Sequence, residues 1–410
     1  MINVKFLSLY LRIFIIFNCL TIVSLVANDG FEDEDDFGGD EVIEIVKVEQ
    51  VEQSDFSYYG SVAFSSNYSY VDLDKVTSAK ISADLNLEYK IDDNYKVKST
   101  IKAYEDFETN IDNDRDADIN EFYLQGSVTS KVDIKVGRQI VVWGKSDNIR
   151  ITDTLNPMDR TAPGMVDIED LRLGRGMIKA DYFMDKWSLS GIVLAENRFS
   201  TMPEVGSDYY SPGFAMIPNE PDNNRDNKGI ALSLNGNLEG QDIAFYASNQ
   251  YLDNTNYKSN MVGFAYNKVM GSFLLKTEAA HFINQCDKSQ CDNYDSATVK
   301  SKTDGLVGLE YNGISDGSIS LEVANKDEDI QYALRFTQSY LNQTLDFTAL
   351  YSGYGKELED GGFTRIWSDY AYNDDIQLSF GFIDYIGGDA TYFEQIKDND
   401  RIFGSLKYSF

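Results

Sequence analysis

The sequence predicts an all-β fold, a transmembrane antiparallel up-and-down β-barrel of about 18 strands, with about 16 as the alternative, and with long extracellular loops. Three observations predict it. From about residue 57, apolar and polar residues alternate in segments long enough to cross a bilayer as tilted strands. Short and long connections alternate along the chain. The last residue, Phe410, is an aromatic on the apolar face of the final segment.

The composition agrees with a barrel and excludes some other classes. Of the 410 residues 13% are aromatic, with 27 Tyr and 24 Phe but only 6 Pro. Tyr and Phe favour strands, and Tyr also suits a membrane interface. The mean hydropathy of −0.36 argues against a helical membrane protein, but barrel strands need an apolar residue only at every second position. The net charge of −31 excludes a general nucleic-acid binder; long, solvated acidic loops account for it.

Three segments are expected along the chain. Residues 1–27 are predicted to be a secretory signal peptide, because Lys5 and Arg12 precede an apolar run that ends near Ala27; an uncleaved membrane anchor is the alternative. Residues 28–56 form an acidic leader whose dense like charge predicts disorder. Residues 57–410 are expected to form the barrel.

The alternation is most regular in residues 80–91. One set of side chains is apolar: Ile81, Ala83, Leu85, Leu87, Tyr89 and Ile91. The other is polar: Lys80, Ser82, Asp84, Asn86, Glu88 and Lys90. A strand places the two sets on opposite faces. Asp92-Asp93-Asn94 then predicts a tight turn into a similar segment that starts at Tyr95.

The connections separate into two kinds. Short ones are expected near residues 92–94, 129–131, 184–186, 239–241, 269–271, 314–317, 342–343 and 374–375. Longer ones are expected near 72–79, 109–117, 144–175, 197–227, 252–258, 284–303, 325–329, 355–362 and 387–399. Strict alternation of short periplasmic turns with longer external loops gives the predicted strand count.

A barrel of this size is too wide for side chains alone to fill, so a polar, water-filled lumen is expected. Lysines at positions 80, 90, 96, 98 and 102 would form a basic strip on one wall, with Asp84 and Glu88 facing the same space. Two interpretations stay open: mutual neutralisation along a wet wall, or a transverse field that orients solutes at a constriction.

The third external loop, 144–175, carries dense charge of both signs. Loops of this length with internal charge pairing are usually folded and often functional. It is expected either to fold inward and constrict the lumen or to pair with itself as a cap that seals the barrel. Folded inward, its arginines, Arg175 included, would face its aspartates. The candidate pore and constriction residues are Arg138, Lys145, Asp147, Arg150, Asp153, Asp159, Arg160, Asp167, Asp170 and Arg172, with Lys96, Lys98 and Lys102 on the wall.

Strict alternation from Val132 would send Arg138 into lipid, at a cost of about 2–4 kcal/mol at mid-membrane. We expect a β-bulge at Gly137 to turn Arg138 inward, because Gly is a frequent bulge residue. Placement near the outer interface would also lower the cost.

Gly137-Arg138-Gln139, Trp143-Gly144, Asp147 and then Leu155-Asn156-Pro157-Met158-Asp159 carry a family resemblance. This stretch of about 40 residues resembles a poorly characterised family of Gram-negative outer-membrane, porin-like barrels with Gly-Arg-Gln, Trp-Gly and Leu-Asn-Pro motifs. Its members often occur beside RND-type inner-membrane transporters. The resemblance implies location in the bacterial outer membrane and transport of a solute or lipid-like molecule. Tyr408 and Phe410 likewise resemble the C-terminal signal that such barrels present to the barrel assembly machinery.

Other chemistry is weakly indicated. Cys286 and Cys291 form a close pair that predicts a loop disulfide in an exported protein. The sole histidine, His281, is expected at a polar rim, since nothing selects a nucleophile and carboxylate for it. Prolines and aromatic residues in loop 197–227 predict an ordered lid, with the aromatic residues most often packing the loop itself. We predict no enzyme, no cofactor and no metal.

The leading hypothesis is a porin-like channel that passes small solutes through a lumen narrowed by loop 144–175. One alternative is a component that moves lipid-like or hydrophobic cargo with an inner-membrane transporter. The other is a non-conducting barrel that acts as an adhesin or anchor. Expected partners are outer-membrane lipid, the assembly machinery and the cargo, without nucleic acid.

Overall fold

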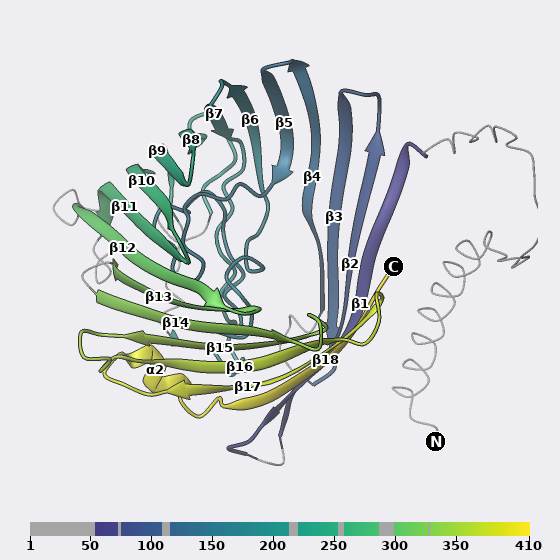
Figure 1. Ribbon diagram of the computed structural model, residues 1–410, viewed down its shortest axis with the longest axis vertical. Coiled ribbons are helices and arrows are strands. Elements are labelled where there is room, and N and C mark those ends of the chain that lie inside the picture. Colours follow the sequence, from purple (N-terminus) through teal and green to yellow (C-terminus); the bar gives the residue numbers. More distant parts are fainter. Residues whose placement is uncertain are drawn as a thin grey trace, which may run out of the picture. The chain divides into compact units, whose positions relative to one another are not determined.

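The computed structural model describes residues 54–72, 75–108, 115–212, 220–252, 258–286, 299–326 and 329–410. The predicted signal peptide and most of the acidic leader lie outside these residues. Ser54–Phe410 form one compact unit, and an 18-stranded antiparallel sheet makes up nearly all of it (Figure 1).

The strands are β1 (Phe56–Ser69), β2 (Val76–Lys90), β3 (Tyr95–Asp106), β4 (Arg115–Thr129), β5 (Val132–Gln139), β6 (Arg175–Phe183), β7 (Trp187–Leu194), β8 (Gly229–Leu238), β9 (Gln241–Tyr251), β10 (Lys258–Met270), β11 (Phe273–Cys286), β12 (Val299–Ile314), β13 (Gly317–Lys326), β14 (Asp329–Tyr340), β15 (Leu345–Tyr354), β16 (Gly361–Ala371), β17 (Ile376–Ile386) and β18 (Arg401–Ser409). One short helix, α2 (Thr391–Ile396), precedes β18. No helix in the described part of the chain has the length and hydrophobicity of a transmembrane segment.

The sheet closes on itself. Each strand pairs with its neighbours in sequence, and β1 also pairs with β18, from Ser61 opposite Ser409 to Ser69 opposite Arg401. The predicted fold class and the predicted eighteen strands are therefore confirmed.

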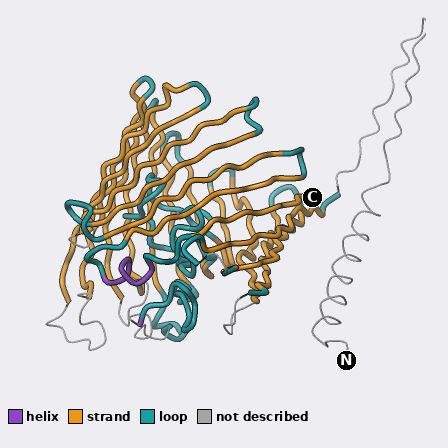
Figure 2. Tube along the Cα trace, turned by 90° about the horizontal axis from the view of Figure 1, so that it is seen from below, coloured by secondary structure: helices purple, strands orange, loops and turns teal. Residues whose placement is uncertain are grey.

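Connections of two kinds lie at opposite ends of the barrel (Figure 2). The short turns form from local chemistry: Asp92 Oδ1, for example, accepts hydrogen bonds of 2.8 Å from the backbone N–H groups of Asn94 and Tyr95. Rings gather beside these turns, as in the contact of Phe273 with Tyr311 at 4.8 Å between ring centroids. Aromatic residues at one rim are typical of a girdle at a membrane interface.

The two faces of the wall invert the usual distribution of polarity. The outer face exposes large apolar side chains, among them Phe64, Phe122, Ile178, Ile230, Leu232, Val262, Val307, Leu309, Phe380 and Leu406. The inner face buries polar ones, among them Ser190, Ser233, Ser248, Gln250, Lys276, Glu278, Asp304, Glu322, Thr348 and Arg365. A continuous apolar outer band around a polar interior suits a wall surrounded by lipid.

The bulge expected at Gly137 is wrong. Pairing continues without a shift on both sides of Gly137, which lies opposite Tyr123 on β4 and Met177 on β6. Arg138 therefore stays on the outer face, opposite Phe122.

The surroundings of Arg138 explain how its charge is tolerated there. β5 ends at Gln139, so the residues of β4 that precede Phe122 do not pair with β5. Arg138 covers this edge: it donates to the carbonyl oxygen of Ile119 at 3.1 Å. Its guanidinium also pairs with Glu196 at 2.5 Å and Asp118 at 3.2 Å. Paired carboxylates and a backbone acceptor, rather than a bulge, compensate the charge.

Gly137 still fixes the backbone at this point. Its φ is +132°, and a Cβ would lie 2.2 Å from the carbonyl oxygen of Phe122. We expect Gly137→Ala to lower the free energy of unfolding by about 1–3 kcal/mol, because an L-residue is strained there. The measurement is the urea midpoint of the heat-modifiable folded form in detergent. Gly191→Ala is the control, since its Cβ would meet only Leu232 at 3.9 Å; equal midpoints for the two variants would contradict the prediction.

Candidate functional site

The segment between β5 and β6, residues 140–174, lies inside the barrel. In Figure 1 it crosses the space that the strands enclose. It leaves the wall at Gln139 and returns at Arg175, which lie opposite each other in register. The wall is thus complete without the segment, which we call the inner loop.

An apolar contact seats the inner loop on one side of the wall. Trp143 stacks on Tyr246 of β9, with 4.7 Å between ring centroids. Apolar residues of the loop and small wall residues share one buried cluster, in which the loop supplies Val141, Trp143, Ile149, Ile151 and Leu155, and β8–β14 supply Ala231, Ala244, Ala265, Ala280, Ala324 and Ala333. Alanine at lumen-facing positions leaves the room that the loop occupies.

Two buried wall carboxylates bind the backbone of the inner loop. Glu278 on β11 accepts hydrogen bonds from the N–H groups of Lys145 (2.5 Å), Ser146 (2.8 Å) and Thr152 (3.1 Å), and from the hydroxyls of the latter two. Glu322 on β13 accepts from the N–H groups of Asp147 (2.8 Å), Asn148 (3.0 Å) and Ile149 (3.0 Å). Because both anchors lie midway along their strands, the loop sits within the barrel rather than over its mouth.

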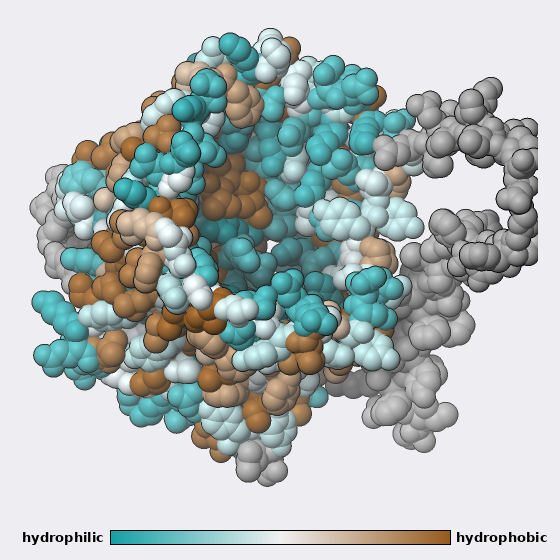
Figure 3. Space-filling model, viewed as in Figure 1, coloured by the Kyte–Doolittle hydropathy of each residue, from teal (hydrophilic) through white to brown (hydrophobic). Residues whose placement is uncertain are grey.

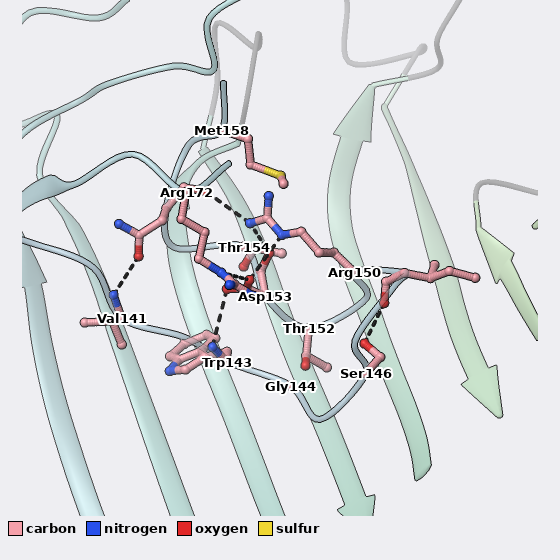
Figure 4. A network of polar contacts seen from close by, with 12 residues as sticks. Val141, Trp143, Gly144, Ser146, Arg150, Thr152, Asp153, Thr154, Met158 and Arg172 are labelled. Atoms are coloured by element: carbon pink, nitrogen blue, oxygen red, sulfur yellow. Dashed lines mark hydrogen bonds and ion pairs between the residues drawn. The ribbon is translucent and has the colours of Figure 1, made fainter. Parts of the chain in front are cut away.

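Inside the loop, Asp153 is the centre of a polar network (Figure 4). Its carboxylate pairs with Arg172 at 2.9 Å and Arg150 at 3.2 Å, and it accepts the N–H of Trp143 at 3.3 Å. Asn156 accepts from the N–H of Val141 at 2.8 Å. The two arms of the loop are therefore tied together before the chain returns to β6.

A second loop, 195–228, is joined to the inner loop. Thr201 donates its N–H to Met158 at 3.0 Å and accepts from the N–H of Arg160 at 2.9 Å. The tip of the second loop reaches the far wall, where Asp208 pairs with Arg401 of β18 at 3.2 Å. Tyr209 shares a 2.9 Å hydrogen bond with the hydroxyl of Tyr385. Burial raises the pKa of Tyr209, which keeps its hydroxyl protonated for this contact. These contacts fasten the described part of the predicted lid, and residues 213–219 lie outside the described residues.

The loops fill one side of the lumen and leave the other accessible. Inward side chains in the middle of β8–β13 are buried under the inner loop, whereas several of those on β2 and β3, such as Lys80, Asp84 and Lys102, keep partial or full exposure. Figure 3 shows a hollow with hydrophilic residues on the side of β2–β4. We call this remaining space the lateral passage.

On the wall of the lateral passage, the predicted lysines face inward and some are neutralised. Lys96 pairs with Glu88 at 3.0 Å, and Lys98 lies 3.9 Å from Glu121. Lys80 instead lies over the ring of Tyr104, 4.5 Å from its centroid. Local neutralisation therefore accounts for part of the basic strip.

The charged residues of the inner loop have partly different neighbours from those expected. Arg150 and Arg172 do face Asp153, but wall residues bind several of the other charges. Asp147 pairs with Lys276, Asp167 with Arg335 and Arg365, Lys145 with Asp242 at 3.8 Å, and Arg175 with Gln250 at 2.8 Å. Asp159 binds the N–H and hydroxyl of Thr161 in its own turn, and Arg160 and Asp170 are exposed at the loop edge.

Sequence reasoning missed the wall anchors Glu278, Glu322, Arg335 and Arg365. A signal was present for the first two: each precedes an alanine at the next inward position, Ala280 and Ala324, whereas the inward positions of β2 and β3 carry polar residues. An alanine beside a carboxylate on a lumen face indicates that something packs there.

Two further expectations concern β11. The predicted disulfide of Cys286 and Cys291 falls outside the residues whose side chains are described. His281 lies directly opposite Thr303, with Nδ1 2.9 Å from its hydroxyl, as an ordinary cross-strand pair on the outer face. The described residues contain no group of His, Cys, Asp and Glu that could hold a metal.

These features define the class: a closed 18-stranded β-barrel with a folded loop inside its lumen. Residues 63–410 match the model of the DUF1302 family, described as a protein of unknown function. The chain belongs to this family. No curated protein matches it.

Solved structures of similar fold include OccD3 (OpdP) of Pseudomonas aeruginosa, with a TM-score of 0.53, 8% identity and coverage of 87% of this chain and 91% of that one. OccAB4 of Acinetobacter baumannii has a TM-score of 0.52 and 11% identity, with coverage of 87% of this chain and 97% of that one. OccK8 (OprE) of P. aeruginosa has a TM-score of 0.51 and 11% identity, with coverage of 87% of this chain and 98% of that one. At these identities the likeness shows the fold alone.

The anchoring by Glu278 makes a direct prediction. Glu278→Ala removes a charged acceptor of several loop donors, each such hydrogen bond being worth about 1.5–3 kcal/mol. We expect proteases to cleave within 140–174 at least about tenfold faster, because local opening becomes less costly, while the wall stays folded. Limited proteolysis of the detergent-solubilised protein measures this.

The control is Glu239→Ala, which removes an exposed carboxylate beside a short turn. If the two variants are cleaved at the same rate, Glu278 does not hold the inner loop.

Proposed function

We propose that this chain is a porin-like channel of the bacterial outer membrane that passes small solutes by diffusion beside the inner loop. The observation that carries the proposal is the uneven filling of the lumen. The loop is seated on β8–β14, while lumen-facing side chains of β2 and β3 such as Lys80, Asp84 and Lys102 keep contact with solvent. An apolar outer face around a polar, partly open interior supports a wet pathway through a bilayer.

In this proposal the lateral passage is the constriction, and Lys96, Lys98 and Lys102 line its wall. Lys145 and Asp147 pair with Asp242 of β9 and Lys276 of β11 on the side where the loop is seated, although Asp147 keeps 54% side-chain exposure. The other charged residues of the inner loop hold it in shape and set the width of the passage.

Replacing residues 140–174 by an Asn-Gly turn tests the proposal. Gln139 and Arg175 lie opposite each other, so a tight turn can join them without disturbing the wall. We expect a steady single-channel conductance for the full chain in a planar bilayer, and a severalfold larger one for the variant. An Asn-Gly replacement of residues 355–360, an external connection, is the matched control and should leave the conductance unchanged.

Other outcomes discriminate between functions. A pore that appears only after the replacement would make the inner loop a plug, and would favour gated transport or a lipid-like cargo passed on by an inner-membrane transporter. No conductance from either form would contradict the channel and favour an adhesin or anchor.

The C-terminus supports a second part of the proposal, recognition by the barrel assembly machinery. Phe410 exchanges backbone hydrogen bonds of 2.9 and 3.0 Å with Gly60, and Tyr408 is 38% exposed on the outer face. The aromatic pair thus lies at the seam where the barrel closes.

Deleting Phe410 should lower the fraction of chain that reaches the folded form in cells, because the machinery reads the aromatic terminus. The heat-modifiable fraction in isolated membranes measures this, with Ser409→Ala as the control. Refolding of the purified deletion variant in detergent should stay normal; a loss there as well would indicate a structural role instead.

A further inference from the structure

A pair of arginines holds the far end of the inner loop. Asp167 lies 2.8 Å from an Nη atom of Arg335 on β14 and 3.0 Å from one of Arg365 on β16. Leu350 of β15 is opposite both arginines in register, so the two guanidiniums project from alternate strands into the same part of the lumen.

The pair carries more positive charge than Asp167 neutralises, and the other carboxylate that acts on Arg365 is Asp369, four residues along β16. Two guanidiniums share the carboxylate of Asp167, and each repels the other at short range. Arg365 is 7% exposed, and its buried Nε has no hydrogen-bond partner among the described residues. Both guanidiniums lie over Trp367, 3.8 and 5.4 Å from the ring centroid, which helps to hold cations in place. An incompletely satisfied guanidinium pair of this kind is suited to a planar oxyanion.

The site can be reached from the lumen. Arg335 and Asp167 keep 24% and 21% side-chain exposure. The neighbouring loop residues Val166, Glu169 and Asp170 are exposed, whereas the loop core near Glu278 is buried. Ala162 and Met165 pack against Ile383 and Tyr385 and hold the backbone of this part of the loop on the wall, so only the side chain of Asp167 has to turn away from the arginines.

We propose that Arg335 and Arg365 form a carboxylate-binding station of the channel, and that Asp167 occupies it as an internal competitor. The inference rests on the proposed channel function and names its substrate class, small solutes that bear a carboxylate. A passing carboxylate replaces that of Asp167 between the guanidiniums and is released when Asp167 returns. Leu350, which is partly exposed, offers apolar surface to the body of the solute beside its charged group.

The test measures how potassium acetate reduces the single-channel conductance carried by potassium chloride, for the native chain and for Asp167→Asn, Arg335→Gln and Arg365→Gln. Removing the competitor should lower the half-blocking acetate concentration, by about tenfold if Asp167 is bound nine-tenths of the time. Removing either arginine should abolish the block. Arg225→Gln, on an exposed part of the second loop, is the matched control and should behave as the native chain.

Asp167→Asn and the two arginine variants should change the acetate block in opposite directions, and this distinguishes a binding station from ion pairs that only fasten the loop. If the ion pairs only fasten the loop, all three variants should raise the conductance alike and leave the acetate block unchanged, which would overturn the proposal. The same holds if Asp167→Asn weakens the block. A native chain that shows no conductance at all would contradict the channel function itself, so the two failures are distinguishable.

Discussion

The internal architecture depends on the hydrogen bonds between two wall carboxylates and the backbone of the inner loop. Glu278 and Glu322 are 3% and 1% exposed. A carboxylate buried this deeply is costly unless donors surround it, and a loop buried inside a barrel is costly unless its N–H groups find acceptors. Each side satisfies the other, so neither arrangement would persist alone. This mutual requirement determines where the loop lies and therefore what shape of lumen remains.

The apolar contacts place the inner loop on one side of the lumen. Alanines face the lumen on β8–β14, and their small side chains leave space in which the loop lies close to the wall. On β2 and β3 the corresponding positions carry lysine, asparagine, aspartate and glutamate, which are better hydrated than buried. Side-chain size on one wall and hydration on the other thus produce a barrel filled on one side.

Much of the fold could be predicted from the sequence, because barrel pairing is local. The alternation in residues 80–91 corresponds to the two faces of β2, and Asp92-Asp93-Asn94 forms the turn that its composition predicts. The inner-loop partners could not be predicted in the same way. Asp147 meets Lys276, and Asp167 meets Arg335 and Arg365, through contacts across the lumen that leave no periodic trace in the sequence.

Arg138 shows a second limit. Its outward direction follows from period two, but its compensation comes from Glu196 and Asp118, which reach it only because β5 is short. Strand ends are set by what the following loop binds, and here the loop binds residues far along the chain. The local pattern therefore predicted the outward direction of Arg138 correctly, but it predicted a β-bulge where ion pairs compensate the charge.

The chain order of these contacts has a consequence for assembly. Consecutive strands form the wall, with β1 and β18 alone pairing at the seam. The inner loop instead binds partners that come much later in the chain, from Lys145 with Glu278, 133 positions apart, to Asp167 with Arg365, 198 positions apart. Contacts at such separation form late. The first hairpins can therefore form around an empty bore, and the inner loop reaches its full set of contacts only once β8–β16 are in place.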